Sequence, residues 1–99
     1  MDMQNQTTSK QLFPLGRIMT TPGIMELDPL GIRIPGLIKR HVTGDWGELG
    51  AEDAKLNDLA VNDGTRIFSA YQMRGEKVWV ITEADRSATT VLLPSEYQP

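Results

Sequence analysis

The pattern of apolar and polar positions is most regular in the last third of the chain, where it predicts β-strands. Residues 66–73 (RIFSAYQM) alternate and are rich in aromatic residues, and residues 77–82 (KVWVIT) are almost all β-formers, as expected of a central strand. Residues 88–93 (ATTVLL) make a third such run, which ends at Pro94. Because the connections are short turns, consecutive strands should pair antiparallel. The pattern therefore predicts a three-stranded antiparallel β-meander.

Apolar residues at helical spacing mark the middle of the chain. Residues 51–63 are the best helix candidate, with Leu56, Leu59 and Ala60 as a narrow apolar stripe. Gly64 is placed for a left-handed C-cap, which would end this helix. The stripe is the side by which we expect the helix to pack.

Two shorter helices and one strand are expected before residue 51. Thr21 is a suitable N-cap and Pro22 suits the first helical position, and this helix must end before Pro29. A second short helix is expected over residues 35–42, and residues 15–20 favour a short strand. The whole pattern indicates an α+β fold. The C-terminal antiparallel three-stranded β-meander, open to a fourth N-terminal strand, would be covered on one face by two or three short helices.

Length and composition agree with one small domain. The chain has 99 residues, of which 39% are hydrophobic and 23% charged, as is typical of a globular protein. We expect residues 1–10, which are polar, to form a flexible tail, and residues 11–97 to form a single α+β domain. No apolar run approaches the length of a membrane span and the N-terminus lacks the apolar stretch of a signal peptide, so we expect a cytoplasmic protein. The absence of cysteine excludes disulfides, thiolate zinc sites and cysteine nucleophiles.

The charge is unevenly distributed along the chain. The net charge is −3, which disfavours non-specific nucleic-acid binding. Residues 10–40 nevertheless hold five basic and two acidic side chains, whereas residues 45–63 hold six acidic side chains and one basic. The folded protein could therefore present one acidic face and one basic face.

The first group of candidate functional residues lies in residues 41–48 (HVTGDWGE), around the only histidine. One hypothesis makes His41 a general base oriented by Asp45, or a metal ligand together with Asp45 and Glu48. The other has His41 cap the end of a helix and has Trp46 pack on the core and pin the loop. A single histidine without a recognised metal-ligand spacing favours the structural interpretation.

The second group lies in residues 82–90 (TEADRSATT), at a hairpin connection. Glu83, Asp85 and Arg86 could form a polar site with Arg66 from the neighbouring strand, and two arginines would suit a phosphate or a carboxylate. Ordinary turn chemistry is the alternative, in which Asp85 and Ser87 bond nearby backbone amides and Arg86 pairs with an acid. We favour turn chemistry, although the stretch carries more polar groups than a plain hairpin needs.

Several enzyme signatures are absent from the sequence. It has no phosphate-binding glycine loop, no GxSxG elbow, no HExxH motif and no dinucleotide fingerprint. It also has no glycine-rich loop for S-adenosylmethionine and no Asn-Pro-Pro-aromatic motif of the kind that methyltransferases use on a flipped base. We therefore expect no cofactor and no resident metal.

Four segments carry a resemblance to a known family: residues 15–23 (LGRIMTTPG), 44–58 (GDWGELGAEDAKLND), 65–71 (TRIFSAY) and 78–97 (VWVITEADRSATTVLLPSEY). They resemble a family of short uncharacterised proteins of bacterial plasmids and integrative elements. Most members are labelled plasmid-related, and some are labelled as a subunit of a type I restriction methyltransferase. The resemblance implies a mobile genetic element and supplies no catalytic residues.

These observations lead to two main hypotheses about function. The first is a small non-enzymatic accessory protein, an anti-defence or regulatory factor that binds a host or element protein through an acidic face including Glu52, Asp53 and Asp58. The second is a compact metal-dependent hydrolase or nuclease, whose acid or metal groups and base would be Asp45, Glu48, Glu83, Asp85 and His41. A DNA-binding regulator using residues 10–40 is the weakest option, and a homodimer is left open because a short meander leaves an edge strand to pair.

Overall fold

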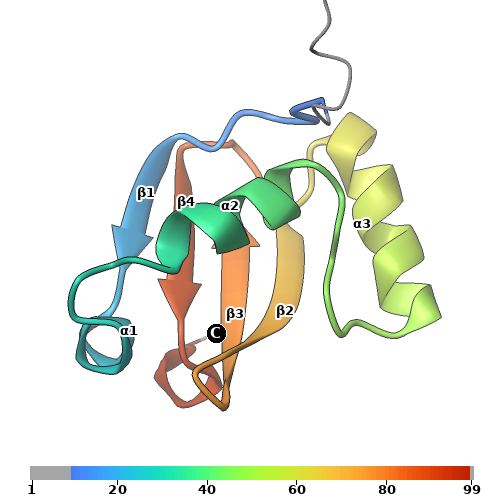
Figure 1. The fold of residues 1–99 in the computed structure, drawn as a ribbon. Helices are drawn as coiled ribbons and strands as arrows, with labels where there is room; N and C mark the ends of the chain where they lie inside the picture. Colours follow the sequence, from blue (N-terminus) through green and yellow to red (C-terminus); the bar gives the residue numbers. More distant parts are fainter. Residues whose placement is uncertain (1–9, 99) are drawn as a thin grey trace, which may run out of the picture.

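A four-stranded mixed β-sheet organises the chain (Figure 1). The computed structural model describes residues 10–98, and the tail expected over residues 1–10 lies outside this range apart from Lys10. The strands stand in the order β1-β4-β3-β2. Their bounds are Arg17–Thr20 for β1, Ile67–Met73 for β2, Glu76–Thr82 for β3 and Ala88–Leu92 for β4.

The predicted antiparallel meander is confirmed in β2, β3 and β4. Both neighbouring pairs are antiparallel, with Trp79 of β3 standing between Ala70 and Leu92. Arg74 and Gly75, which connect β2 and β3, have φ values of 52° and 82°. Two consecutive positive φ values are typical of the tight hairpin turn whose twist matches that of the flanking strands.

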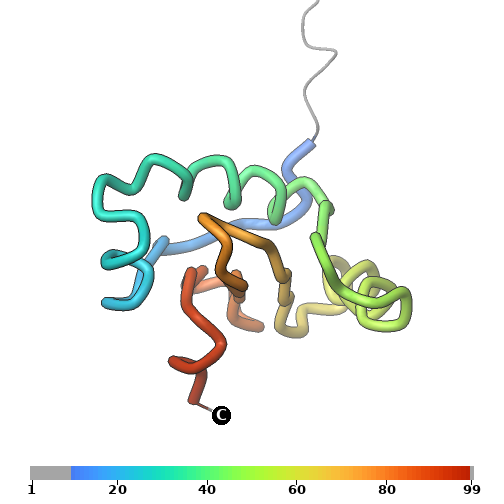
Figure 2. The backbone as a smooth tube through the Cα atoms, turned by 60° about the horizontal axis from the view of Figure 1, so that its bottom comes forward, coloured from blue at the N-terminus to red at the C-terminus, as the bar shows by residue number. Residues whose placement is uncertain are grey.

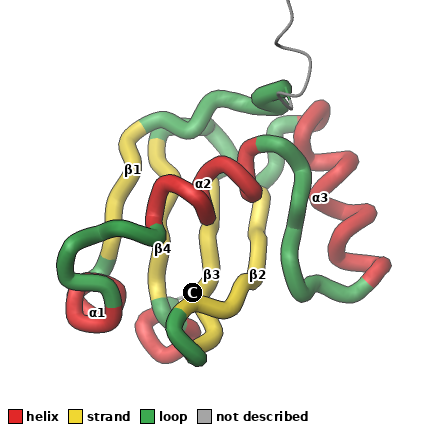
Figure 3. Tube along the Cα trace, in the orientation of Figure 1, coloured by secondary structure: helices red, strands yellow, loops and turns green. Residues whose placement is uncertain are grey.

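The fourth, N-terminal strand is also present, and it joins the sheet at the far edge of the meander. β1 pairs in parallel with β4, with Arg17 opposite Ala88 and Thr20 opposite Val91. Parallel neighbours need a long crossover connection, and here it comprises every element between β1 and β4 (Figure 3).

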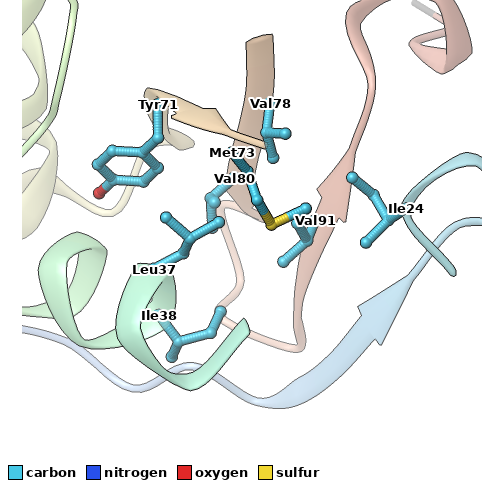
Figure 4. Packing of buried hydrophobic residues seen from close by; sticks show 8 residues of the cluster. All are labelled: Ile24, Leu37, Ile38, Tyr71, Met73, Val78, Val80 and Val91. Atoms are coloured by element: carbon cyan, nitrogen blue, oxygen red, sulfur yellow. The ribbon is translucent and has the colours of Figure 1, made fainter. Parts of the chain in front are cut away.

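The first two helices cover one face of the sheet, as expected. α1 spans Pro22–Leu27 and α2 spans Ile34–Val42, whereas the C-terminal 3-10 turn, Pro94–Glu96, lies on the other side (Figure 2). Ile24 of α1 and Leu37 and Ile38 of α2 pack on the inward side chains of the three C-terminal strands (Figure 4). These strand residues are Tyr71, Met73, Val78, Val80 and Val91.

The third helix lies beside the sheet, along the edge strand β2. α3 spans Ala51–Asp63, the range that the sequence predicts, and Gly64 ends it in the left-handed conformation with a φ of 77°. Of the predicted apolar stripe, Ala60 is buried as expected, but Leu56 and Leu59 are 63% and 57% exposed and Asn57 is buried in their place. The small Ala60 lets the helix approach β2 closely. Asn57 is buried because the backbone groups of an edge strand need polar partners, which a leucine cannot supply.

The expected N-cap of α1 is wrong in its chemistry. Thr21 holds the N-cap position but makes no side-chain hydrogen bond to its own helix. Its hydroxyl instead donates to the Glu96 carboxylate at 2.5 Å, and that carboxylate accepts the N–H of Gly23 at 2.8 Å. A carboxylate distant in sequence therefore takes the role of the local cap.

The outer edge of β2 is closed by polar contacts. The side-chain amide of Asn57 donates to the Phe68 carbonyl at 2.6 Å and accepts the Phe68 N–H at 3.2 Å. Two residues further along β2, Ala70 donates its N–H to the Trp46 carbonyl and accepts the N–H of Glu48 at its own carbonyl. Gly47 lies between them with a φ of 75°, and a Cβ there would stand 1.9 Å from the Ala70 carbonyl oxygen. Only glycine fits this approach.

Candidate functional site

His41 lies inside the protein, at the end of α2. It has no solvent exposure. Its Nδ1 lies 2.6 Å from the Ser69 hydroxyl and its Nε2 lies 2.9 Å from the Thr82 hydroxyl. Thr82 in turn contacts the Thr89 hydroxyl at 2.7 Å, and Thr89 donates to the carbonyl of Leu15 at 2.7 Å. The histidine is therefore one member of a buried hydrogen-bonded chain.

The end of this chain determines where its protons lie. The Leu15 carbonyl can only accept, so the Thr89 hydroxyl donates its single hydrogen to it and must accept a hydrogen bond from Thr82. Thr82 must then accept from His41, which places the ring proton on Nε2 and leaves Nδ1 to accept from Ser69. The neutral ring satisfies every group. Burial lowers the pKa of His41 from 6.5 to about 4. A ring with both nitrogens engaged and no route to solvent cannot serve a substrate as a general base.

Asp45 does not orient His41 but pairs with Arg40. The guanidinium Nε of Arg40 donates to the carboxylate at 2.7 Å, and this hydrogen bond lowers the pKa of Asp45. The Arg40 guanidinium also lies 4.5 Å from the centre of the Tyr71 ring, and the Tyr71 hydroxyl donates to the Asp45 carbonyl at 2.6 Å. Desolvation raises the pKa of Tyr71 to about 12. Asp45 thus anchors the loop that leads to α3.

Two further members of the first candidate group also hold the loop. Glu48 accepts from Gln72 at 3.3 Å and lies 3.7 Å from the ammonium of Lys77. Trp46 is buried, and its indole N–H donates to Asp58 of α3 at 3.0 Å. Trp46 packs in a second apolar cluster beside Phe13 and Val42. The expected packing of Trp46 on the core is therefore confirmed, whereas the expected capping by His41 is wrong: Thr43 holds the C-cap position, and the His41 ring bonds Ser69 and Thr82.

The side chains of the second candidate group, around residues 82–90, make local contacts within the turn and with nearby residues. Asp85 accepts the N–H of Ser87 at 3.0 Å, and hydrogen bonds from Ser87 lower the pKa of Asp85. Glu83 pairs with Arg66 at 3.3 Å, and Arg66 also donates to the hydroxyl of Tyr97 at 2.9 Å. Of the group, Glu83 and Arg66 alone meet in an ion pair, near the surface of the sheet.

Arg86 fastens the hairpin between β3 and β4 to the rest of the fold. Its guanidinium donates to the carbonyls of Thr65 and Ala60, both at 2.7 Å, and also to those of Glu83 and Ala84. The Ala60 carbonyl belongs to the last turn of α3, where a positive charge is favourable. The expected pairing of Arg86 with an acid is therefore wrong, because backbone carbonyls engage the guanidinium instead, and it is not displayed for a phosphate or carboxylate.

The structure does not assemble the carboxylates that the hydrolase hypothesis requires. Asp45, Glu48, Glu83 and Asp85 each have a different local partner, and His41 is enclosed. Among residues 10–98, no group of three or more His, Asp or Glu side chains could hold a metal ion. The geometry therefore lends no support to metal-dependent hydrolysis within this part of the chain.

The outward side of α3 is a further candidate for a functional surface, apart from the two groups of residues above. Glu52 and Asp53 are exposed in its first turn, Asp63 is exposed at its end, and Leu56 and Leu59 are exposed between them. Residues 52, 56, 59 and 63 recur at helical spacing and lie on one side of the helix. From the sequence alone, the spacing of Leu56 and Leu59 predicts a buried side of the helix. That these leucines lie on the surface becomes clear only when the structure shows which side of α3 is buried.

A groove continues this surface towards the sheet. Its volume is about 290 Å³ and its lining includes Leu49, Asp53, Leu56 and Phe68. Phe68 is the first of three aromatic rings on the face of the sheet opposite α1 and α2. Its centre lies 4.8 Å from that of Trp79, which lies 5.7 Å from that of Tyr97. Apolar side chains thus continue from the exposed leucines of α3 onto half-buried aromatic rings of the adjoining sheet.

Comparison with known proteins gives no family to which the chain can be assigned. No protein-family model matches it, and neither does any curated protein or solved structure. Within residues 10–98, the helices are all too short or too polar to cross a membrane. The class that the fold defines is a small α+β protein with a mixed sheet, and function must be argued from its surfaces.

Proposed function

We propose that this protein is a non-enzymatic interaction protein that binds a protein partner through the outward side of α3. The observation that carries the proposal is the pair Leu56 and Leu59, exposed side by side at 63% and 57% between carboxylates of the same helix. Isolated exposed leucines are common on protein surfaces, but two on one helical stripe beside a groove supply the central anchors of an interface.

The carboxylates of α3 specify the chemistry of the partner. Six of the seven charged side chains in residues 45–63 are acidic, and three of these six, Asp45, Glu48 and Asp58, are engaged by Arg40, Lys77 and Trp46. Glu52 and Asp53 have no ion-pair partner among residues 10–98. Their charge favours a basic partner and speeds its encounter, whereas the leucines contribute most of the affinity once buried.

The expected partner surface is therefore basic and contains an apolar cleft, as the nucleic-acid-binding site of a protein often does. Occupying such a site would block it. This is the way in which an anti-defence or regulatory factor of a mobile genetic element would act, with the partner a host or element protein. Hydrolase or nuclease activity would need carboxylates that converge, which residues 10–98 do not provide.

The test is affinity capture from a lysate of the encoding organism, using the native protein and matched surface variants. Leu56→Ser with Leu59→Ser should abolish capture of the specific partner, and Glu52→Lys with Asp53→Lys should weaken it at least tenfold at low salt. Leu30→Ser removes a leucine that is still more exposed, on the connection between α1 and α2, and should change nothing. Failure to capture any partner, or capture that both α3 variants retain, would refute the proposal.

A further inference from the structure

The two edges of the sheet differ in whether their outward backbone groups have hydrogen-bond partners. The β2 edge is closed by Asn57 and by the loop around Gly47. In β1, the N–H of Arg17 bonds Ser87 and the N–H of Thr21 bonds Val91, so odd-numbered residues direct their backbone groups towards β4. The backbone N–H and C=O groups of Ile18 and Thr20 consequently point away from the sheet, and they have no partner among residues 10–98.

The side chains of β1 do not protect this open edge. All four residues are exposed, and Ile18 and Met19 retain 46% and 41% of their surface. Sheet edges that remain single are commonly protected by lysine, proline or a bulge. Here the only charged residue of the strand is Arg17, at its first position, and the edge carries no charge beyond it.

We propose that β1 pairs antiparallel with β1 of a second copy of this chain, centred on Met19. This register places Ile18 opposite the partner's Thr20, and the twofold axis repeats the pair. Because these are the residues whose backbone groups point outward, each pair exchanges two hydrogen bonds, as in an ordinary antiparallel ladder. The two sheets then join into one continuous sheet. This inference does not depend on the function proposed for α3.

Charge complementarity is the reason to favour a second copy over another extended segment. Arg17, Met19 and Thr21 direct their side chains to the same face because alternate residues of a strand do so. The Glu96 carboxylate is held on Thr21, where its three hydrogen bonds come from uncharged groups of Thr21, Gly23 and Leu93. Arg17 has no ion-pair partner among residues 10–98.

The register centred on Met19 brings these two unpaired charges together. It sets Arg17 opposite the partner's Thr21, and so against the partner's Glu96, at a separation that a cross-strand pair can bridge. The twofold axis produces the same pair at the other end of the strand. An unrelated peptide would have to supply both a carboxylate and an arginine at these positions, whereas a second copy always does. The strand is short, so we expect a dimer at the weak end of specific interfaces.

Sedimentation equilibrium over a range from about 1 µM to about 1 mM tests the dimer. The mass of the native protein should rise with concentration from 11.0 kDa towards twice that value. Thr20→Pro removes an outward N–H without touching the bonds to β4 and should stay monomeric. Arg17→Glu should weaken association at least tenfold, Arg17→Lys should largely retain it, and Leu56→Lys on α3 should behave as the native protein does.

Circular dichroism confirms that each variant is folded, and Ile18→Lys replaces Thr20→Pro if the proline variant is not. A native protein that remains monomeric at the highest concentration would overturn the proposal. The proposal would also be overturned if Arg17→Glu and the variant of the outward edge, Thr20→Pro or Ile18→Lys, both associated with native affinity. Binding of an unrelated extended peptide at β1 by a monomeric native protein would show that the edge serves another partner, and the dimer would be rejected.

Discussion

At the scale of single residues, the main outcome is that side chains which resemble catalytic groups hold the fold together. His41 joins α2 to β2, β3 and β4 through one chain of hydroxyl groups. Arg86 joins the hairpin between β3 and β4 to α3 by donating to backbone carbonyls. In a domain of this size the core is small, so buried polar networks of this kind define which arrangement is native.

The buried histidine predicts how stability depends on pH. Its pKa is about 4 in the folded protein and near 6.5 when unfolded, so between these values the unfolded chain binds the additional proton. The free energy of unfolding should therefore keep its full value above pH 6.5 and fall by roughly 3 kcal/mol as the pH drops to 4. Urea unfolding at several pH values between 5 and 7 measures this slope.

The control for this prediction is His41→Gln. The variant should be less stable at pH 7, because the hydroxyls of Ser69 and Thr82 lose a well-placed partner. Its stability should change little between pH 5 and 7, because the chain has no other histidine and the carboxylates titrate lower. A slope that survives the substitution would assign the titration to a different group.

At the scale of elements, α3 is the helix whose packing departs from its own apolar pattern. It uses an amide and an alanine to lie along β2, and it leaves two leucines in solvent. The Asn57 amide acts as a further strand residue would, offering one donor and one acceptor to the Phe68 backbone. Protection of the edge by a helix of this kind removes one site of unwanted strand pairing.

Asn57→Ala is therefore expected to destabilise the protein by about 2 kcal/mol, because it leaves the N–H and C=O of Phe68 without partners at the junction with α3. Asn62→Ala, on the exposed side of the same helix, should change stability by less than about 0.5 kcal/mol. Chemical denaturation of both variants measures the difference. Equal effects would mean that the amide does not protect the edge.

At the scale of the whole molecule, the two proposed contact regions lie at opposite edges of the sheet. α3 flanks β2, while β1 ends the sheet on the other side (Figure 1). A dimer through β1 would leave both copies of α3 exposed, and each could engage its own partner. Pairing and partner binding would then be independent, so a variant at one edge should leave the other function intact.

The dimer also predicts that thermal stability depends on protein concentration. Because only the folded chain can pair through β1, a hundredfold increase in concentration should raise the Tm of the native protein by roughly 5 °C. Ile18→Lys should show the same Tm at every concentration. Scanning calorimetry over this range gives the comparison, and a native Tm that does not move would contradict pairing through β1.

The amino-acid sequence by itself determined the local elements. The meander, the start of α1, the range of α3, and α2 to within one residue were all predicted. They follow from side-chain periodicity, proline and glycine positions and turn residues, all of which act over a few neighbouring residues.

Only the tertiary structure decided how those elements meet. It set the parallel pairing of β1 with β4, the side of α3 that faces β2, and the partners of the candidate carboxylates. It also placed His41 against Ser69 and Thr82, which lie 28 and 41 residues away along the chain. The physical reason is that burial and polar pairing depend on which distant segments the folded sheet brings together, and no local pattern contains that information.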